Sequence, residues 1–220
     1  MRRWLCLGAA LGLAVMLAAC NSGGGGGGSG GSGDYDYLYR MNAIELGGHT
    51  IRWPNNIISV SSGGVAGVAA AFNQWASASG GAVGFVFTGG GANVKMRYGS
   101  TGGCGVTYIS FNSAGLITKV SMVIERSQAS CDGGLAATVT HEAGHAIGFM
   151  GHDTTGIMHP YQAGPITSQQ GEMIRLLYSM PPGTDITGKL RGAKVAGRSS
   201  KYDSRGKRVY HLVIRKACDK

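Results

Sequence analysis

A short stretch of the chain places two histidines and a glutamate where they could hold and use a metal ion. His141 and His145 are four residues apart, and Glu142 directly follows the first histidine. On an α-helix, residues four apart lie on one face, so both imidazoles could bind the same Zn²⁺. Glu142 would project about a third of a turn away, where it can take a proton from water without ligating the metal. The chemistry that this spacing predicts is metal-assisted hydrolysis.

A catalytic zinc site needs a third protein ligand and one open coordination position. Gly148 can end the helix and turn the chain back toward the metal, which makes His152 the predicted third ligand. Asp153, His159 and Glu172 are the alternatives that the sequence leaves open.

A turn with a methionine follows these histidines. Residues 156–160 predict a tight turn, and its Met158 would pack beneath the metal site. The whole stretch 141–160 resembles the metzincin clan of zinc peptidases, and most closely the catalytic domains of matrix metalloproteinases. His152 lies one residue later than the clan's spacing, which falls on Gly151, and an insertion in a glycine-rich turn accommodates this shift.

The resemblance reaches beyond the histidines. Residues 65–87 are similar to the first helix of that family and the strand after it, and residues 174–178 are similar to its last helix. The similarity therefore covers roughly residues 50–183. No upstream segment resembles the family's latency cysteine.

The resemblance implies a function and a set of roles. It implies a zinc-dependent endopeptidase with one catalytic Zn²⁺ bound by His141, His145 and His152. Glu142 would act as the general base toward a metal-activated water. Structural Ca²⁺ ions also occur in this clan, but the sequence indicates no position for one.

The resemblance also implies how substrate binds. A protein or peptide would lie extended along an edge strand, for which residues 117–125 are the candidate, by strand addition. The loop 160–165 would line the pocket for the side chain after the cut. Within it, Tyr161 is a candidate for oxyanion stabilisation, although a packing role is the simpler interpretation.

Apolar periodicity and turn residues predict the elements that would position the site. The candidate strands are residues 51–60, 83–88, 94–98, 106–111 and 117–125, and the candidate helices are 65–78, 135–148 and 166–178. Thr167 is the expected N-cap of the last helix. We predict an α+β fold, in which a metzincin-like twisted mixed sheet with an antiparallel edge strand is backed by helices. The active-site helix would be followed by the turn that carries the methionine.

The N-terminus resembles the signal of a bacterial lipoprotein. Arg2 and Arg3 precede an apolar stretch too short to span a bilayer comfortably, and Leu17–Cys20 resembles a lipobox. The predicted organisation is a signal peptide at 1–19, a lipidated Cys20 with a Gly/Ser tether to residue 33, a catalytic domain at 34–185 and a basic tail at 186–220. We expect an exported protein anchored in the outer membrane or on the cell surface, with its domain outside the cytoplasm.

The positive charge is concentrated at one end of the chain. The formal net charge is +9, and residues 189–220 alone hold eleven lysines and arginines against two aspartates. The rest of the chain is balanced, which argues against a nucleic-acid-binding body and leaves polyanion contact as an accessory role of the tail. The body itself is expected to be a monomer.

Three cysteines remain after the signal and the lipidated residue are set aside. In an oxidising compartment, Cys104 and Cys131 are the preferred disulfide, and Cys218 is left free or paired elsewhere.

The alternative function is a non-catalytic zinc-binding surface lipoprotein or adhesin module, with accessory polyanion binding by the tail. The presence of Glu142 argues against it, because a module that only binds zinc has no need of that carboxylate.

Overall fold

The computed structural model describes residues 32–191, 201–202 and 208–218. Their α-helices are α1 (Ser32–Met41), α2 (Val68–Ala78), α3 (Gly134–Ile147) and α4 (Ser168–Tyr178), with 3₁₀ helices η1 (Ala43–Leu46), η2 (Gly156–Met158) and η3 (Thr187–Lys189). The strands are β1 (Ile57–Ser61), β2 (Gly84–Phe87), β3 (Val94–Tyr98), β4 (Gly105–Asn112), β5 (Ile117–Ile124), β6 (Lys201–Tyr202) and β7 (Arg208–Lys216).

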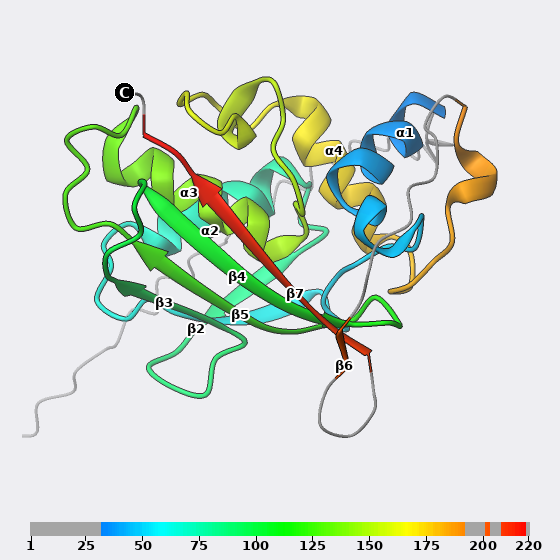
Figure 1. The fold of residues 1–220 in the computed structure, drawn as a ribbon, viewed down its shortest axis with the longest axis horizontal. Helices are drawn as coiled ribbons and strands as arrows, with labels where there is room; N and C mark the ends of the chain where they lie inside the picture. The colour runs from blue at the N-terminus through cyan, green and yellow to red at the C-terminus, as the bar shows by residue number, and fades with distance from the viewer. Residues whose placement is uncertain (1–31, 192–200, 203–207, 219–220) are drawn as a thin grey trace, which may run out of the picture.

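The strands form one mixed sheet in the order β2-β1-β3-β5-β4-β7-β6 (Figure 1). The pairs among β2, β1, β3 and β5 are parallel, whereas β4 runs antiparallel to both β5 and β7. The predicted mixed α and β architecture with an antiparallel strand is therefore confirmed at this level.

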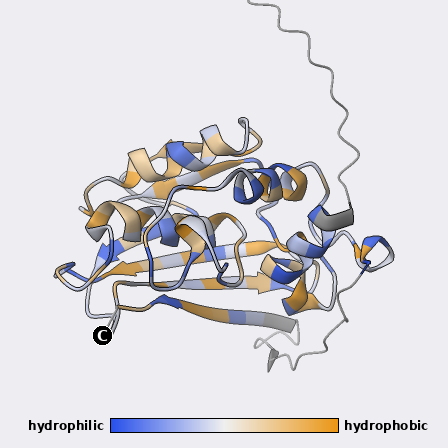
Figure 2. Cartoon of the chain, turned by 90° about the horizontal axis from the view of Figure 1, so that it is seen from above, coloured by the Kyte–Doolittle hydropathy of each residue, from blue (hydrophilic) through white to orange (hydrophobic). Residues whose placement is uncertain are grey.

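The helices α2 and α3 lie together over one face of the sheet, and α1 packs against α4 beside them (Figure 1). Figure 2 shows hydrophobic residues concentrated along the central strands and the helices above them. Trp75 of α2 is fully buried in this layer, and its indole N–H donates to the carbonyl of Thr140 on α3 at 2.8 Å. Apolar burial between helices and sheet thus fixes α3 over β4 and β5.

The predicted helix α3 ends where the glycine pattern indicated. Gly148 is its C-cap and has φ of 139°, a conformation that L side chains rarely adopt. A Cβ atom there would lie 2.6 Å from the Leu177 side chain of α4. The last helix also begins as predicted, because Thr167 caps α4 in a reciprocal capping box with Gln170.

The strand β5 lies at a different position in the sheet from the predicted one. The prediction that residues 117–125 form the edge strand is wrong, because β5 lies between β3 and β4. Apolar alternation identifies a strand but carries no information about which strands become its neighbours. The antiparallel strand next to it is β4, and β7 covers the other edge of β4.

Three further boundaries differ from the expected ones. Residues 208–216, expected within a basic tail, form β7 of the sheet. The helix α1 begins at Ser32, inside the segment expected to be a tether. In the candidate strand 51–60, only the part from Ile57 onward is a strand, after the irregular segment around Pro54.

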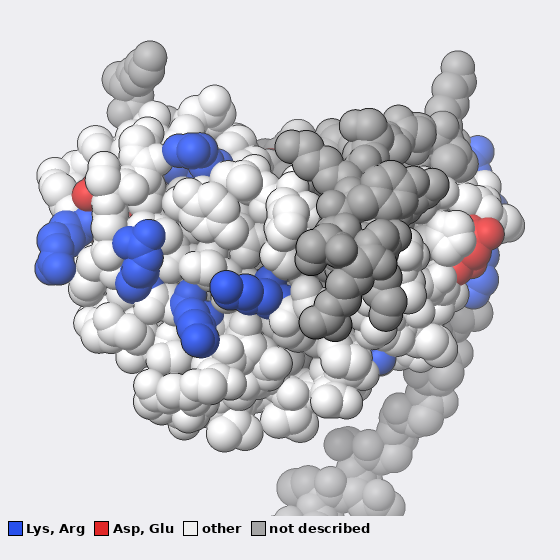
Figure 3. Space-filling model, turned by 60° about the horizontal axis from the view of Figure 1, so that its bottom comes forward, with Lys and Arg blue, Asp and Glu red and all other residues white. Residues whose placement is uncertain are grey.

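The open face of the sheet carries positive charge of its own. Figure 3, which brings the bottom of Figure 1 forward, shows several Lys and Arg side chains spread over this face and few acidic ones. Lys95 and Arg97 of β3 and Lys119 of β5 are exposed. Although the net charge of the chain before residue 189 is close to zero, several of its basic side chains gather on the open face of the sheet.

Within the described ranges, none of the helices has the length and apolarity needed to cross a bilayer.

The predicted signal peptide and Cys20 lie outside the described residues, as does most of the predicted tether.

Candidate metal centre

The structure brings the three predicted histidines together. The Nε2 atom of His141 lies 3.0 Å from that of His145 and 3.2 Å from that of His152. One ligand atom from each residue lies within 4.8 Å of the other two. His141 and His145 are fully buried on α3, and His152 is partly exposed on the loop after it.

The hydrogen bonds of the first two rings fix which nitrogen carries the proton. The Nδ1 atom of His141 contacts the carbonyl oxygen of Ile157 at 2.7 Å, and that of His145 contacts the carbonyl oxygen of Phe149 at 2.7 Å. A carbonyl can only accept, so each Nδ1 is the donor and each Nε2 carries a bare lone pair.

Two such lone pairs 3.0 Å apart repel each other, and a cation bound by both removes the repulsion. Nitrogen ligands of a tetrahedral zinc, at about 2.0–2.1 Å from the ion, lie about 3.3 Å from one another. The spacing of His141, His145 and His152, together with the protonation of the first two rings, therefore fits a zinc ion.

Burial keeps these rings neutral. It lowers the pKa of His145 to about 3 and that of His152 to about 4, in each case with a further lowering from neighbouring charges such as Lys216. Burial and the adjacent imidazoles hold the pKa of His141 well below its usual range. All three residues are thus in the form that binds metal at neutral pH.

The alternative ligand Asp153 is engaged elsewhere. Its carboxylate accepts a hydrogen bond from the Tyr37 hydroxyl of α1 at 2.5 Å and one from the Gln170 amide of α4 at 3.1 Å. Asp153 therefore fastens the loop beside His152 to two helices, a role that sequence reasoning missed.

The other two alternatives do not join the cluster. The Nδ1 atom of His159 accepts from the backbone N–H groups of Tyr161 and Gln162, and Glu172 is exposed and pairs with Arg175. Tyr161 itself is 48% exposed, so its predicted oxyanion role gains no support.

The predicted methionine turn lies directly beneath α3. Met158 is fully buried, and a Cβ atom added to Gly144 would collide with its sulfur and lie 2.7 Å from the ring of Trp75. Gly144, between the two helical histidines, thus permits the close approach of η2 to α3.

Glu142 lies buried between α3 and β4. Its Oε2 atom accepts a hydrogen bond from the Thr107 hydroxyl at 2.5 Å, while no hydrogen bond reaches its Oε1 atom. Burial raises the pKa of Glu142 to about 8, although Thr107 and Lys216 act against this rise. Sequence reasoning missed Thr107, whose signal is a polar residue on the buried face of an apolar strand.

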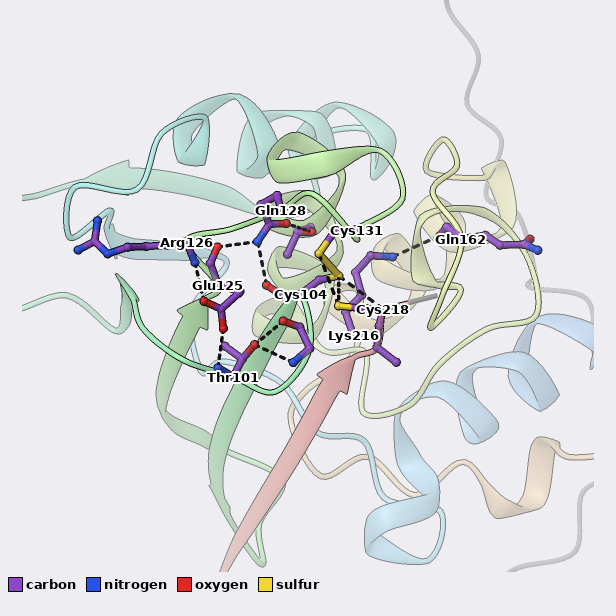
Figure 4. Close-up of a disulfide and its surroundings, with 12 residues drawn as sticks. Thr101, Cys104, Glu125, Arg126, Gln128, Cys131, Gln162, Lys216 and Cys218 are labelled. Atoms are coloured by element: carbon purple, nitrogen blue, oxygen red, sulfur yellow. Dashed lines mark hydrogen bonds between the residues drawn. A yellow bond between two sulfur atoms is a disulfide. The ribbon is translucent and has the colours of Figure 1, made fainter. Parts of the chain in front are cut away.

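Lys216, at the end of β7, is also part of this centre and was not predicted. It is fully buried, and its ammonium group donates to the carbonyl oxygen of Gln162 at 3.3 Å (Figure 4). A lysine side chain is almost never fully buried unless it is paired with other groups. The burial of Lys216 beside Glu142 therefore indicates that polar contacts hold its ammonium group at this site.

The predicted disulfide between Cys104 and Cys131 is confirmed. Cys218 is free, and its sulfur lies 3.2 Å from that of Cys104 (Figure 4). The disulfide joins the start of β4 to the segment that leads into α3, so it holds together the two elements that carry Thr107 and Glu142.

No protein-family model matches this chain, and no curated protein sequence matches it either.

Proposed function

We propose that this chain is a zinc-dependent endopeptidase with a metzincin-like centre, in which His141, His145 and His152 bind the metal and Glu142 is the general base. The observation that carries the proposal is the convergence of three imidazole nitrogens, those of His141 and His145 with bare lone pairs, while Glu142 lies buried on the helix that carries these two histidines. Metal binding alone would not require that carboxyl.

The protein's own groups account for the proton transfers of peptide hydrolysis. A zinc ion bound here would supply Lewis acidity, which makes water nucleophilic near neutral pH. Thr107 holds one oxygen of Glu142, which leaves Oε1 to take a proton from water and return it to the leaving amine.

We also propose that the protein acts outside the cytoplasm as a lipoprotein anchored through Cys20. The Cys104–Cys131 disulfide supports an oxidising compartment. Metabolic labelling with a palmitate analogue should mark the wild-type chain and not Cys20→Ser.

Metal content tests the ligand set. The purified chain from Cys20 onward should retain about one zinc per molecule after dialysis, measured by inductively coupled plasma mass spectrometry. His152→Ala should lose the metal, whereas His159→Ala, on the same loop but outside the cluster, should keep it. Equal zinc retention by both variants would remove His152 from the ligand set.

Cleavage of quenched fluorescent peptides tests the role of Glu142. Glu142→Gln should lower kcat by about 10²–10⁴-fold with zinc retained, which is the usual contribution of a general base. Glu172→Gln, at an exposed site on α4, should leave both properties unchanged. Zinc retention without hydrolysis by any form of the wild-type chain would instead favour the non-catalytic surface module.

A further inference from the structure

The strand that borders the proposed catalytic centre is β4, and it is not open to solvent along its length. Thr107 of β4 contacts Glu142, so a peptide that binds along β4 would pass beside the metal. Recognition of an extended peptide by strand addition requires a free edge with unpaired backbone groups. On the side away from β5, that edge is occupied by β7.

β7 makes the contacts that such a peptide would make. It pairs antiparallel with β4 in continuous register from Gly105↔Lys216 to Asn112↔Val209. At the metal end, the carbonyl of Lys216 accepts from the backbone N–H of Cys104 at 2.9 Å. On the opposite side, the N–H of Ala217 donates to the carbonyl of Pro160 at 3.1 Å. The segment therefore lies between β4 and the loop 160–165, hydrogen-bonded to both.

The side chain of Lys216 enters the space beside the centre. Ile214 and Lys216 are buried on the α3 side of β7, whereas Val213 and Arg215 are exposed. The ammonium of Lys216 reaches the carbonyl of Gln162 (Figure 4). A strand that served only to extend the sheet would place an apolar residue at this fully buried position.

We infer that β4 and the loop 160–165 form a peptide-binding groove, that β7 occupies this groove as an internal peptide, and that the pocket holding Lys216 accepts long basic side chains. The partner that fits is an extended peptide with a lysine or arginine, and β7 must leave before it enters. The hydrolytic part of this inference rests on the proposed function, whereas the binding part does not.

The peptide chain that connects β7 to the rest of the protein explains why β7 stays bound in the groove. A strand tethered within the same chain has an effective concentration of roughly millimolar, so it outcompetes peptides present at micromolar levels. The same strand without its covalent link would dissociate on dilution. The intact chain is therefore a latent form, and the full burial of Glu142 is a property of that form.

A cleavable version of the full chain tests the groove. A site for a specific protease is inserted between residues 192 and 200, and the folded Glu142→Gln chain is cut and diluted. The probe is a fluorescein-labelled peptide of residues 208–218 with Cys218→Ser, followed by fluorescence anisotropy. The cut chain should bind this peptide and the uncut chain should not. Equal binding by cut and uncut chains would overturn the inference.

Two variant peptides, each with one basic residue replaced by glutamate, test the pocket. The Lys216→Glu peptide should bind at least about tenfold more weakly than the parent peptide, because its side chain enters the buried pocket. The Arg215→Glu peptide, altered one residue away on the exposed side, loses only the hydrogen bond from Arg215 to the Thr101 carbonyl oxygen and should bind within about fivefold of the parent. Equal affinity of the Lys216→Glu peptide would refute the basic pocket.

Hydrolysis by the Glu142-containing chain separates this inference from the proposed function. After cutting and dilution, kcat/KM toward peptides with lysine or arginine should rise by about tenfold or more. Peptide exchange without hydrolysis would uphold the groove and reject the peptidase. Hydrolysis that is unchanged by the release of β7 would uphold the peptidase and reject the groove.

Discussion

At the scale of single residues, the Thr107 hydroxyl donates a hydrogen bond to Glu142, and valine can replace this threonine with nearly the same side-chain shape. Thr107→Val leaves a buried carboxyl oxygen without its donor, so the free energy of unfolding should fall by about 1–3 kcal/mol in urea titrations. Thr118→Val, which removes an exposed hydroxyl bonded to Ser110, should cost less than about 0.5 kcal/mol. An equal loss in the free energy of unfolding for Thr107→Val and Thr118→Val would contradict the hydrogen bond between Thr107 and Glu142.

Glu142 should also set a pH dependence in the metal-free protein. Its pKa is raised from 4.5 to about 8 in the fold, so between these values the folded state binds a proton that the unfolded state has released. The contribution of protonated Glu142 to the free energy of unfolding is therefore fully present below pH 4.5 and is lost as the pH rises toward 8. The histidines, whose pKa values are lowered from 6.5, act in the opposite direction and only below pH 6.5.

Among the described residues whose pKa is shifted, Glu142 is the group whose protonation changes between pH 6.5 and 8. In chelated protein, the free energy of unfolding should fall by about 2 kcal/mol between pH 6.5 and 8, at about 1.4 kcal/mol per pH unit for one proton. Glu142→Gln should abolish this slope, and Glu172→Gln should preserve it. Urea titrations at four pH values measure it, and a slope that survives in Glu142→Gln would assign it to another group.

The residues of the centre differ in how far the sequence could predict them. His141, Glu142 and His145 belong to one helix, so their relative positions follow from helical geometry alone. His152 required only a short turn after Gly148. Thr107 and Lys216 come from strands far away in sequence, and their contacts with Glu142 depend on strand order, which local patterns do not encode.

At the scale of elements, the end of α3 is held by a segment that the sequence did not reveal as structured. The buried side chain of Asn42, just after α1, donates to the carbonyl oxygens of Ile51 and Gly148 at 2.6 and 2.7 Å. Its own oxygen accepts from the N–H of Ile51 at 2.8 Å. This side chain therefore fixes the turn from which the chain proceeds to His152.

Removal of these bonds should loosen both the fold and the metal site. Asn42→Ala should lower the free energy of unfolding by about 3 kcal/mol, at roughly 1 kcal/mol for each hydrogen bond, and should speed zinc loss to a chelator. Asn93→Ala is the matched control, because Asn93 makes a similar set of bonds to Ser59 at an exposed site. Zinc loss at an unchanged rate in Asn42→Ala would contradict this role.

The elements that local patterns predicted are those with strong apolar periodicity, such as α2, α3, β3 and β5. The helix α1 was missed because its sequence mixes charged residues with tyrosines and follows a glycine-rich run. β7 was missed because its charge dominated the interpretation, although its residues alternate between buried and exposed from Val213 to Lys216. In that strand, period-two alternation was the better guide to structure than net charge.

At the scale of the whole molecule, the disulfide is the covalent link between the sheet and the helix layer. It closes a loop of 27 residues, for which the chain-entropy relation gives about 3–4 kcal/mol. Cys104→Ala with Cys131→Ala should lower the free energy of unfolding by this amount, measured in urea under oxidising conditions. Cys218→Ser, which removes the free thiol, should change it by less than about 0.5 kcal/mol.

The position of β7 after every other element that the structure describes has a consequence for biosynthesis. During synthesis and export, the earlier strands and helices emerge first, and folding units generally form in that order. A nascent or prematurely terminated product that lacks β7 would present the edge of β4 unpaired, and only a chain that includes β7 could shield it. Quality control of truncated translation products would then also determine how much unshielded protein a cell contains.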